Sequence, residues 1–294
     1  MSSSHTVSTA SAQPRHNRLL LLSLVGGLVV AAILIAHGAA WWSAPLAVVV
    51  ALVLAHLLAL ALVIGVGVAM TRSGDGEGAP RGELIRRPRL YDWMVRALSG
   101  GREAEMRATW LELADVRRGD AVLDVGCGTG TLLLAAAARV GPQGTLAGVE
   151  AAPEMAARAR DKAAAEGVAV DVREGSADTL PFADGSFDVV FATLVFHHLP
   201  ADVQLGALQE MRRVLRPGGR VVIVDLPHGH DHGHGHGHGG GLFSMIHGGA
   251  GGRLVDFDGE LRSLGAAEVT RHGAGMRALH ATRAVFPATG GAGR

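Results

Sequence analysis

The sequence of 294 residues has little cysteine, few aromatic side chains and no excess of either charge. Cys127 is the only cysteine, which excludes an intramolecular disulfide framework and a metal site built from several cysteines. Lys plus Arg number 27, as do Asp plus Glu, so the chain lacks the overall charge typical of proteins that bind nucleic acid. Aromatic residues make up only 4% and leave few platforms on which bases could stack. We therefore expect no nucleic-acid partner.

One long segment lacks charge altogether. Residues 19–70 contain no Asp, Glu, Lys or Arg. At about 1.5 Å of rise per residue, this run is too long for one helical crossing of a hydrocarbon layer roughly 30 Å thick. We expect two transmembrane helices, near residues 19–41 and 45–70, in which Trp41 and Trp42 suit a membrane interface and Pro45 suits a turn or helix start. The pair would form a hairpin that anchors the protein in a bilayer.

Arginines flank this uncharged run on both sides, while the short connection inside it has none. The positive-inside rule then places both ends in the cytoplasm, with residues 1–18 as a tail and residues 71–89 as an Arg/Gly-rich linker. A cleaved signal peptide is the competing interpretation of the first span. His56 is either a functional site within the membrane or a neutral histidine at the hairpin interface. The arginines are Arg15 and Arg18 before the run, and Arg72, Arg81, Arg86, Arg87 and Arg89 after it.

Short β-rich runs alternate with helical stretches after residue 90. Such alternation predicts an α/β fold with a mostly parallel sheet wrapped by helices. Ligands bind such sheets beyond the carboxyl ends of the strands. A helix is expected at residues 153–166, ending at Gly167. The expected strands are residues 121–125, 145–150, 168–174, 187–193 and 219–226.

The stretch "VLDVGCGTGTL", residues 122–132, carries the clearest functional signal. Because glycine accounts for 42 residues, its G-x-G-x-G pattern alone is weak evidence, and the "HGHGHG" repeat satisfies it as well. The glycines at 126, 128 and 130 differ because they follow an apolar strand and precede a helical run. Glu150 lies twenty residues after Gly130, at the end of the second strand, from which an acid can reach ribose hydroxyls. This combination favours a cofactor site, although Thr131 departs from the dinucleotide pattern G-x-G-x-x-G.

Four segments, in order, resemble those of the class I S-adenosylmethionine-dependent methyltransferases: "VLDVGCGTG", "GVEAAPEM", "ADTLPFADGSFDVVFAT" and "EMRRVLRPGGRVVIVD". The resemblance covers roughly residues 90–286, followed by a tail at 287–294. It implies a Rossmann-like fold with a mostly parallel seven-stranded sheet, helices on both faces, and S-adenosylmethionine as cofactor. "YDWMVRALSGGREAEMR" and "LRPGGRVVIVD" look like the ubiquinone/menaquinone C-methyltransferase branch, whereas "LVFHHLP" is similar to a broader, substrate-diverse group.

The resemblance also implies which residues bind the cofactor. Glu150 would take both ribose hydroxyls, and Tyr91 would cover the cofactor. Many members carry an Asp-Ala pair that contacts the adenine, but this chain has Ser176 and Ala177 at that place. The hydroxyl of Ser176, or the carboxylate of Asp178 in its place, would then hydrogen-bond to the adenine. Asp124, Gly126, Gly128 and Gly130 would surround the methionine part. The other cofactor-binding residues expected are Cys127, Ala151, Met155 and Thr193.

His197 and His198 follow the fourth strand on the side where the ligand is expected. Methyl transfer from a sulfonium is an in-line displacement in which the protein mainly aligns donor and acceptor. A base is needed only if the acceptor must lose a proton, and histidine titrates in a suitable range. We take both histidines as catalytic candidates, the alternative being a pair of polar loop residues.

The run "HGHDHGHGHGHGGG" at residues 228–241 follows the fifth strand. Its six histidines and Asp231 could bind zinc, nickel or copper through imidazole nitrogens. The intervening glycines leave such ligands without fixed geometry, which favours a flexible low-complexity insertion. We expect no metal in the chemistry itself.

Taken together, these features predict a membrane-anchored, S-adenosylmethionine-dependent methyltransferase whose acceptor is a small or lipidic molecule at the cytoplasmic face. A quinone is one option for the acceptor, and a phospholipid amine is another. A protein of a different class, a non-catalytic membrane protein that binds metal through residues 228–241, is the remaining alternative. The motifs specify neither the acceptor atom nor the oligomeric state.

Overall fold

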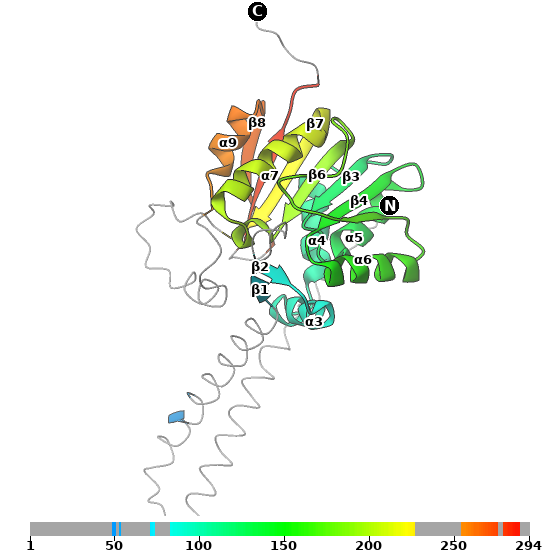
Figure 1. The fold of residues 1–294 in the computed structure, drawn as a ribbon, viewed down its shortest axis with the longest axis vertical. Coiled ribbons are helices and arrows are strands. Elements are labelled where there is room, and N and C mark those ends of the chain that lie inside the picture. Colours follow the sequence, from blue (N-terminus) through cyan, green and yellow to red (C-terminus); the bar gives the residue numbers. More distant parts are fainter. Residues whose placement is uncertain are drawn as a thin grey trace, which may run out of the picture. The chain divides into compact units, whose positions relative to one another are not determined.

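The computed structural model describes residues 49–50, 53, 71–73, 83–226, 254–275 and 279–288 (Figure 1). The chain divides into two compact units, Met1–Val66 and Gly67–Arg294. Among the described residues, no helix is long and apolar enough to cross a membrane. Apart from three exposed valines of the first unit, the expected spans lie outside these residues, as do His56 and the histidine-rich segment 228–241. Both expectations therefore remain predictions.

A seven-stranded sheet in the order β5-β4-β3-β6-β7-β9-β8 forms the centre of the second unit. Strands β5 to β7 pair in parallel, whereas β9 runs antiparallel to both β7 and β8. The prediction of a mostly parallel, seven-stranded sheet is confirmed. Its strands are β3 (Ala121–Val125), β4 (Thr145–Glu150), β5 (Asp171–Glu174), β6 (Phe187–Thr193), β7 (Leu215–Asp225), β8 (Glu268–Gly273) and β9 (His280–Val285).

Strand boundaries agree with the sequence pattern except at two places. Strand β5 begins at Asp171 rather than at residue 168, because it lies at the sheet edge and only Val172 of its residues is buried. Strand β7 begins at Leu215 instead of residue 219. Leu215 pairs with Phe187, and the next paired residue is Arg220, so the intervening "RPGG" forms an irregularity in the strand.

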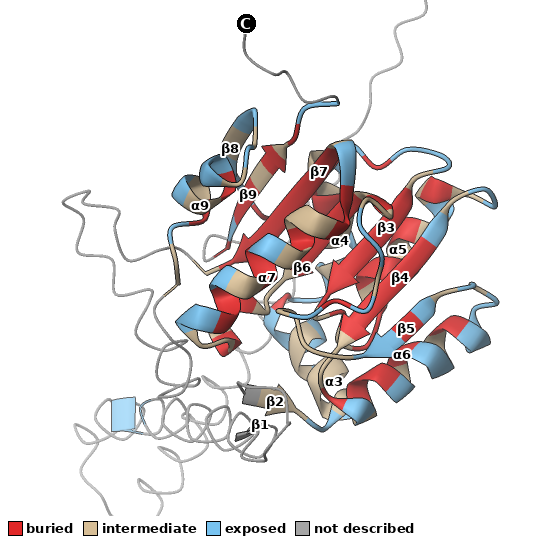
Figure 2. Cartoon of the chain, turned by 45° about the horizontal axis from the view of Figure 1, so that its top comes forward, coloured by how far each residue is buried: buried red, intermediate tan, exposed pale blue. Residues whose placement is uncertain are grey.

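Helices cover both faces of the sheet (Figure 1). On one face, α4, α5 and α6 pack against strand residues such as Val122 and Phe191. On the other face, α7 and α9 pack against the alternate residues, such as Leu123 and Val190. Figure 2 shows the buried residues concentrated in the central strands and on the inner sides of the helices. These helices are α4 (Glu103–Leu113), α5 (Thr131–Val140), α6 (Pro153–Ala165), α7 (Ala201–Val214) and α9 (Phe257–Ser263).

Four smaller elements complete the described part of the unit. Helix α3 (Pro88–Leu98) has Pro88 at its start and no fully buried side chain. Strands β1 (Thr71–Ser73) and β2 (Glu83–Ile85) pair antiparallel within the segment expected to be a linker. A single turn of 3₁₀-helix, η2 (Phe196–His198), follows β6. The segments after β3, β4 and β6 therefore meet at the carboxyl edge of the parallel strands, where a ligand site is expected.

Candidate active site

The turn after β3 requires glycine for two reasons. Gly126 has a φ of 72°, which disfavours other residues, and a Cβ built there would lie 2.5 Å from Cγ2 of Val195. Its N–H donates to the carbonyl of Val149 at 2.8 Å, so the turn is held against β4. Gly130, with a φ of 74°, begins α5, and a Cβ there would come within 3.0 Å of Ala159. The glycines thus bring the backbone close to the segments that enclose the site.

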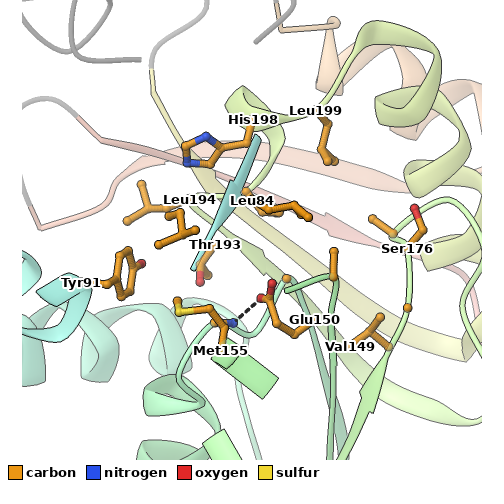
Figure 3. A pocket seen from close by; sticks show the side chains of 17 residues that line it. Leu84, Tyr91, Val149, Glu150, Met155, Ser176, Thr193, Leu194, His198 and Leu199 are labelled. Atoms are coloured by element: carbon orange, nitrogen blue, oxygen red, sulfur yellow. Dashed lines mark hydrogen bonds between the residues drawn. The ribbon is translucent and has the colours of Figure 1, made fainter. Parts of the chain in front are cut away.

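Glu150 ends β4 and is held by two backbone groups. Its Oε2 accepts from the N–H of Gly128 at 2.8 Å (Figure 3). Its Oε1 accepts from the N–H of Ala152 at 2.9 Å. Each carboxylate oxygen keeps a lone pair for a further donor. Burial raises the pKa of Glu150 above its ordinary value, although the backbone hydrogen bonds oppose that rise. The side chain is therefore a fixed acceptor beside the glycine turn.

A pocket opens around Glu150 and holds about 710 Å³ of space, its open mouth included. Tyr91 and Ser176 lie on opposite sides of it, with Glu150 between them (Figure 3). The sequence-predicted residues that line it are Tyr91, Gly126, Gly128, Glu150, Ala151, Met155, Ser176, Ala177, Thr193 and His198.

A second hollow of about 550 Å³ adjoins this pocket and contains Asp124 and Cys127 in its lining. The two share part of their walls, including Tyr91 and Thr193. Asp124 is fully buried, and its Oδ1 has no hydrogen-bond partner among the described residues. Burial, reinforced by the charge of Glu150, raises the pKa of Asp124 to about 8. The hollow therefore offers an unsatisfied acceptor that a cationic donor would stabilise in its ionised form.

Arg107 of α4 supplies the opposite charge in the same hollow, and sequence reasoning missed it. Its guanidinium is partly buried and makes no hydrogen bond or ion pair with any residue that the structure describes. Burial lowers the pKa of Arg107, opposed by the charge of Glu103 among others. Asp124 and Arg107 thus present a buried carboxyl group and a guanidinium in one hollow, each without a hydrogen-bond partner among the described residues. Arg107 is the last residue of the segment "YDWMVRALSGGREAEMR", but the resemblance of that segment assigned it no role in binding.

Tyr91 borders both hollows from α3. Burial, together with the nearby charge of Glu150, raises the pKa of its phenol to about 12. The hydroxyl therefore stays protonated at neutral pH and can act as a donor or as a neutral cover. The neighbouring Asp92 fixes α3: it accepts from Thr129 Oγ1 at 2.6 Å and lies 3.6 Å from Lys162 Nζ. Lys162 also donates to Thr131 at 2.8 Å, so these side chains connect α3 to α5 and α6.

The two histidines have different positions. His198 is buried and lines the pocket, whereas His197 does not line it and is held by Asp225 at the end of β7. Nδ1 of His197 lies 2.6 Å from Oδ1 of Asp225. Asp225 also accepts from the backbone N–H groups of Phe196 and Leu226, at 2.9 and 2.8 Å. The two imidazole rings lie 4.0 Å apart between centroids, so Asp225 fixes the loop that carries both.

The remaining predicted residues are placed as follows. Gly130 does not line either hollow but begins α5 beside them. Ser176 lines the pocket and donates a hydrogen bond to Asp178, which itself is not in the lining.

Leu194, which the sequence did not single out, adopts a φ of 56°, an unusual left-handed conformation for leucine, and borders both hollows. Within the described part of the chain, no three potential metal ligands gather closely enough to hold an ion.

Comparisons with known proteins show what this arrangement is similar to. Residues 122–219 match the family model described as a methyltransferase domain. These residues include the glycine turn, Glu150 and the strand before the histidines. This region is a methyltransferase domain. The fold of the second unit is also similar to that of a solved protein, an S-adenosylmethionine-dependent methyltransferase from Aquifex aeolicus. The two structures superpose over 66% of this chain and 97% of the other chain. The TM-score is 0.50 at 21% identity, so this likeness concerns the fold alone.

Two curated relatives are more similar in sequence to the methyltransferase domain. The demethylmenaquinone methyltransferase of Thermus thermophilus is 40% identical over 137 residues, which are 47% of this chain and 61% of that protein. The ubiquinone/menaquinone biosynthesis C-methyltransferase UbiE of Azotobacter vinelandii is 38% identical over 137 residues, 46% of this chain and 53% of that protein. The chain thus spans only about half to three fifths of these relatives.

S-adenosylmethionine is the cofactor of such domains, and the residues around the two hollows fit it. It carries a positively charged sulfonium and an ammonium group, and Asp124 supplies the buried, unpartnered acceptor that suits a cation. Arg107 suits a carboxylate, and Glu150 suits a ribose diol because both of its oxygens retain acceptor capacity. The site is therefore chemically complementary to each polar part of the cofactor except the adenine, whose contact at Ser176 lacks a carboxylate.

Proposed function

We propose that this protein transfers a methyl group from S-adenosylmethionine to a small, apolar or lipidic acceptor, and that it does so while anchored in a membrane by residues 19–70. The observation that carries the catalytic part is the buried Oδ1 of Asp124, an acceptor without a hydrogen-bond partner among the described residues, in a hollow that also contains Arg107. Leaving such a group unsatisfied is costly unless a ligand completes it.

When bound, S-adenosylmethionine supplies a methyl group on a positively charged sulfur. Asp124 would hold its ammonium, Arg107 its carboxylate and Glu150 its ribose hydroxyls. Tyr91 would cover the bound molecule from α3 and exclude water, because its phenol stays neutral at ordinary pH. The chain's contribution is chiefly to hold donor and acceptor in line, which converts a bimolecular reaction into an effectively intramolecular one.

The acceptor is proposed to be a quinone precursor or a chemically similar ring. Both curated relatives described above are named for menaquinone or ubiquinone biosynthesis. The apolar lining of the pocket near His198, with Leu194 and Leu199, suits such a ring. His198 would accept a proton from the acceptor, and His197, oriented by Asp225, would support it from behind.

The membrane part of the proposal rests on residues 19–70, whose length without charge suits a helical hairpin. The arginines on either side of that run favour a cytoplasmic location for the methyltransferase domain. A lipid-soluble acceptor would then be available to the domain from the adjacent bilayer.

The test of this proposal is transfer of radiolabelled methyl from S-adenosylmethionine to lipid extracted from membranes. The full chain should label a chloroform-soluble product, and Asp124→Asn should abolish the labelling. Asp184→Asn, which changes a carboxylate that is 80% exposed, is the matched control and should leave it unchanged. Labelling of protein or of water-soluble molecules only would contradict a lipidic acceptor. Absence of any labelled product with every fraction tried would contradict methyl transfer itself.

A further inference from the structure

Helix α3 presents an unusual outer surface. Arg89, Trp93 and Arg96 are exposed and follow one another at four and three residues, so they share one side of the helix. The side chain of Trp93 is 60% exposed. Arg87, also exposed, lies just before the helix begins. We call these four residues the α3 docking face.

The charges of this face form no ion pairs among the described residues. Arg87, Arg89 and Arg96 make no ion pair with any residue that the structure describes, although Arg86 beside them pairs with Glu154 at 2.7 Å. Among nearby acids, Asp92 is engaged by Thr129 and Lys162 on the inner side of α3. Arg96 lies close enough to Glu103 to lower the pKa of that carboxyl, so the positive charge of the docking face is only partly compensated. This positive charge surrounds an exposed aromatic ring.

This combination matches the surface of a bilayer that contains anionic lipid. Tryptophan favours the level of the headgroups, where its ring is half in an apolar layer and its N–H meets water. Arginines beside it would contact lipid phosphates, and their attraction depends on the negative charge of the leaflet.

The sequence places this face near a membrane. The uncharged run ends at Met70, and the residues between it and Pro88 could extend at most about 60 Å at roughly 3.5 Å each. If residues 19–70 span a bilayer, α3 is confined to the neighbourhood of its surface. This limit on the position of α3 rests on the proposed anchor. The exposure of Trp93 and of the arginines is independent of that anchor.

Helix α3 also lines a hollow next to the proposed cofactor site. Trp93 and Arg96 help to line a third hollow of about 760 Å³, which also contains Tyr91, Arg107 and Lys162 in its lining. Tyr91 and Arg107 in turn border the hollow that contains Asp124. A molecule dissolved in the lipid beneath α3 could therefore pass along the docking face toward the cofactor site without crossing bulk water.

We propose that the α3 docking face lies on an anionic lipid surface, with Trp93 at headgroup level, and that it directs a lipid-soluble acceptor into the hollow beside Tyr91. The occupant of the face is the bilayer itself, and phosphates of anionic lipids are the groups that its arginines contact.

The test uses the fluorescence of Trp93 in the full chain reconstituted into vesicles. Subtracting the spectrum of Trp93→Phe from that of the unaltered chain isolates this residue from the other tryptophans. In vesicles that contain phosphatidylglycerol, we expect emission at shorter wavelength and strong quenching by lipid brominated near the headgroup. Vesicles of phosphatidylcholine alone, or high salt, should remove both effects.

Charge reversal provides the matched comparison. The first double variant, Arg87→Glu with Arg89→Glu, retains Trp93 and should lose the quenching. The control double variant, Arg118→Glu with Arg262→Glu, changes exposed arginines outside α3 and should retain the quenching. Equal quenching in both pairs of variants would overturn the proposal. So would a Trp93 signal that responds to protein concentration instead of lipid charge, since a second copy would then cover the face. In the unaltered chain, no quenching of Trp93 together with intact S-adenosylmethionine binding contradicts the docking face only. Quenching of Trp93 in the unaltered chain without S-adenosylmethionine binding contradicts only the proposed catalysis.

Discussion

Single side chains determine what the site can bind. Asp124 and Glu150 place two carboxyls beside one another, and among the described residues that line the hollow of Asp124 the one Lys or Arg is the partly buried Arg107. Burial raises the pKa of Asp124 to about 8, and the charge of Glu150 adds to that rise, so the ligand-free site is short of positive charge. A cationic ligand corrects that imbalance. The same imbalance makes the site a source of instability when nothing is bound.

The first prediction concerns this instability. The folded, ligand-free protein holds the Asp124 proton up to about pH 8, whereas the unfolded chain releases it near the ordinary value of 3.8. Folding stability should therefore fall as pH rises between these values. Asp124→Asn should weaken that dependence and stabilise the protein at pH 8 by on the order of 1–3 kcal/mol, while abolishing S-adenosylmethionine binding. Thermal unfolding at pH 6 and pH 8 checks it, with Asp184→Asn as control; identical pH dependence in all three proteins would contradict it.

A second prediction concerns Asp225. If it orients His197 and the loop that carries His198, Asp225→Asn should retain S-adenosylmethionine binding within a few fold but lower methyl transfer by roughly 10²-fold, and the pH dependence of the rate should change. Asp188→Asn, which alters an ion pair with Arg216 away from the pocket, is the matched control. An unchanged pH profile in Asp225→Asn with a merely lowered melting temperature would assign the residue a structural role instead.

At the scale of elements, the turn after β3 depends on close packing as well as on backbone conformation. Gly126→Ala and Gly167→Ala both force alanine into the left-handed region, at a cost of about 1–2 kcal/mol each. Only the first also drives a Cβ to 2.5 Å from Val195, since nothing lies within 4 Å of the second. We expect Gly126→Ala to lose cofactor binding and more stability than Gly167→Ala. Calorimetric melting and binding assays measure both effects, and Val195→Ala should partly rescue the first; equal losses would refute the packing argument.

The attachment of α3 is the other element-scale feature. Asp92 joins α3 to Thr129 and Lys162 in a partly buried network, whereas Arg86 and Glu154 form an exposed ion pair. Because exposed pairs contribute little, Asp92→Ala should weaken S-adenosylmethionine binding several-fold and speed its dissociation, while Arg86→Ala should change it by less than about twofold. Stopped-flow measurement of dissociation distinguishes them. Equal effects would mean that Tyr91 is positioned by something other than the network.

The sequence predicted well what local pattern controls. The apolar strand before "GCGTG" and the helical run after it predict the turn that the structure has. Glu150 was predicted because it lies twenty residues after Gly130, at the end of the second strand. Arg107 and Asp225 were missed because their importance arises from contacts between distant segments. Arg107 reaches the hollow from α4, at the end of a segment whose resemblance gave it no role, and Asp225 meets His197 because β6 and β7 are neighbours in the sheet.

At the scale of the whole molecule, two kinds of information remain separate. The methyltransferase domain follows from a packed sheet, a family match and a complementary pocket. The anchor is a proposal that rests on the absence of charge over residues 19–70, and the histidine-rich segment 228–241 is known from the sequence alone. The α3 docking face is the described part that would connect the two, because it belongs to the domain yet carries the chemistry of a lipid-facing surface.

The measurement that tests the central claim most directly is calorimetric titration of S-adenosylmethionine into the full chain at pH 7, in two buffers of different ionisation enthalpy, with Glu150→Ala alongside. The account predicts micromolar binding, release of a proton as Asp124 ionises against the cation, and at least roughly tenfold weaker binding in the variant, because a charged hydrogen-bond acceptor is lost. No binding by the folded protein, or equal affinity in Glu150→Ala, would contradict it.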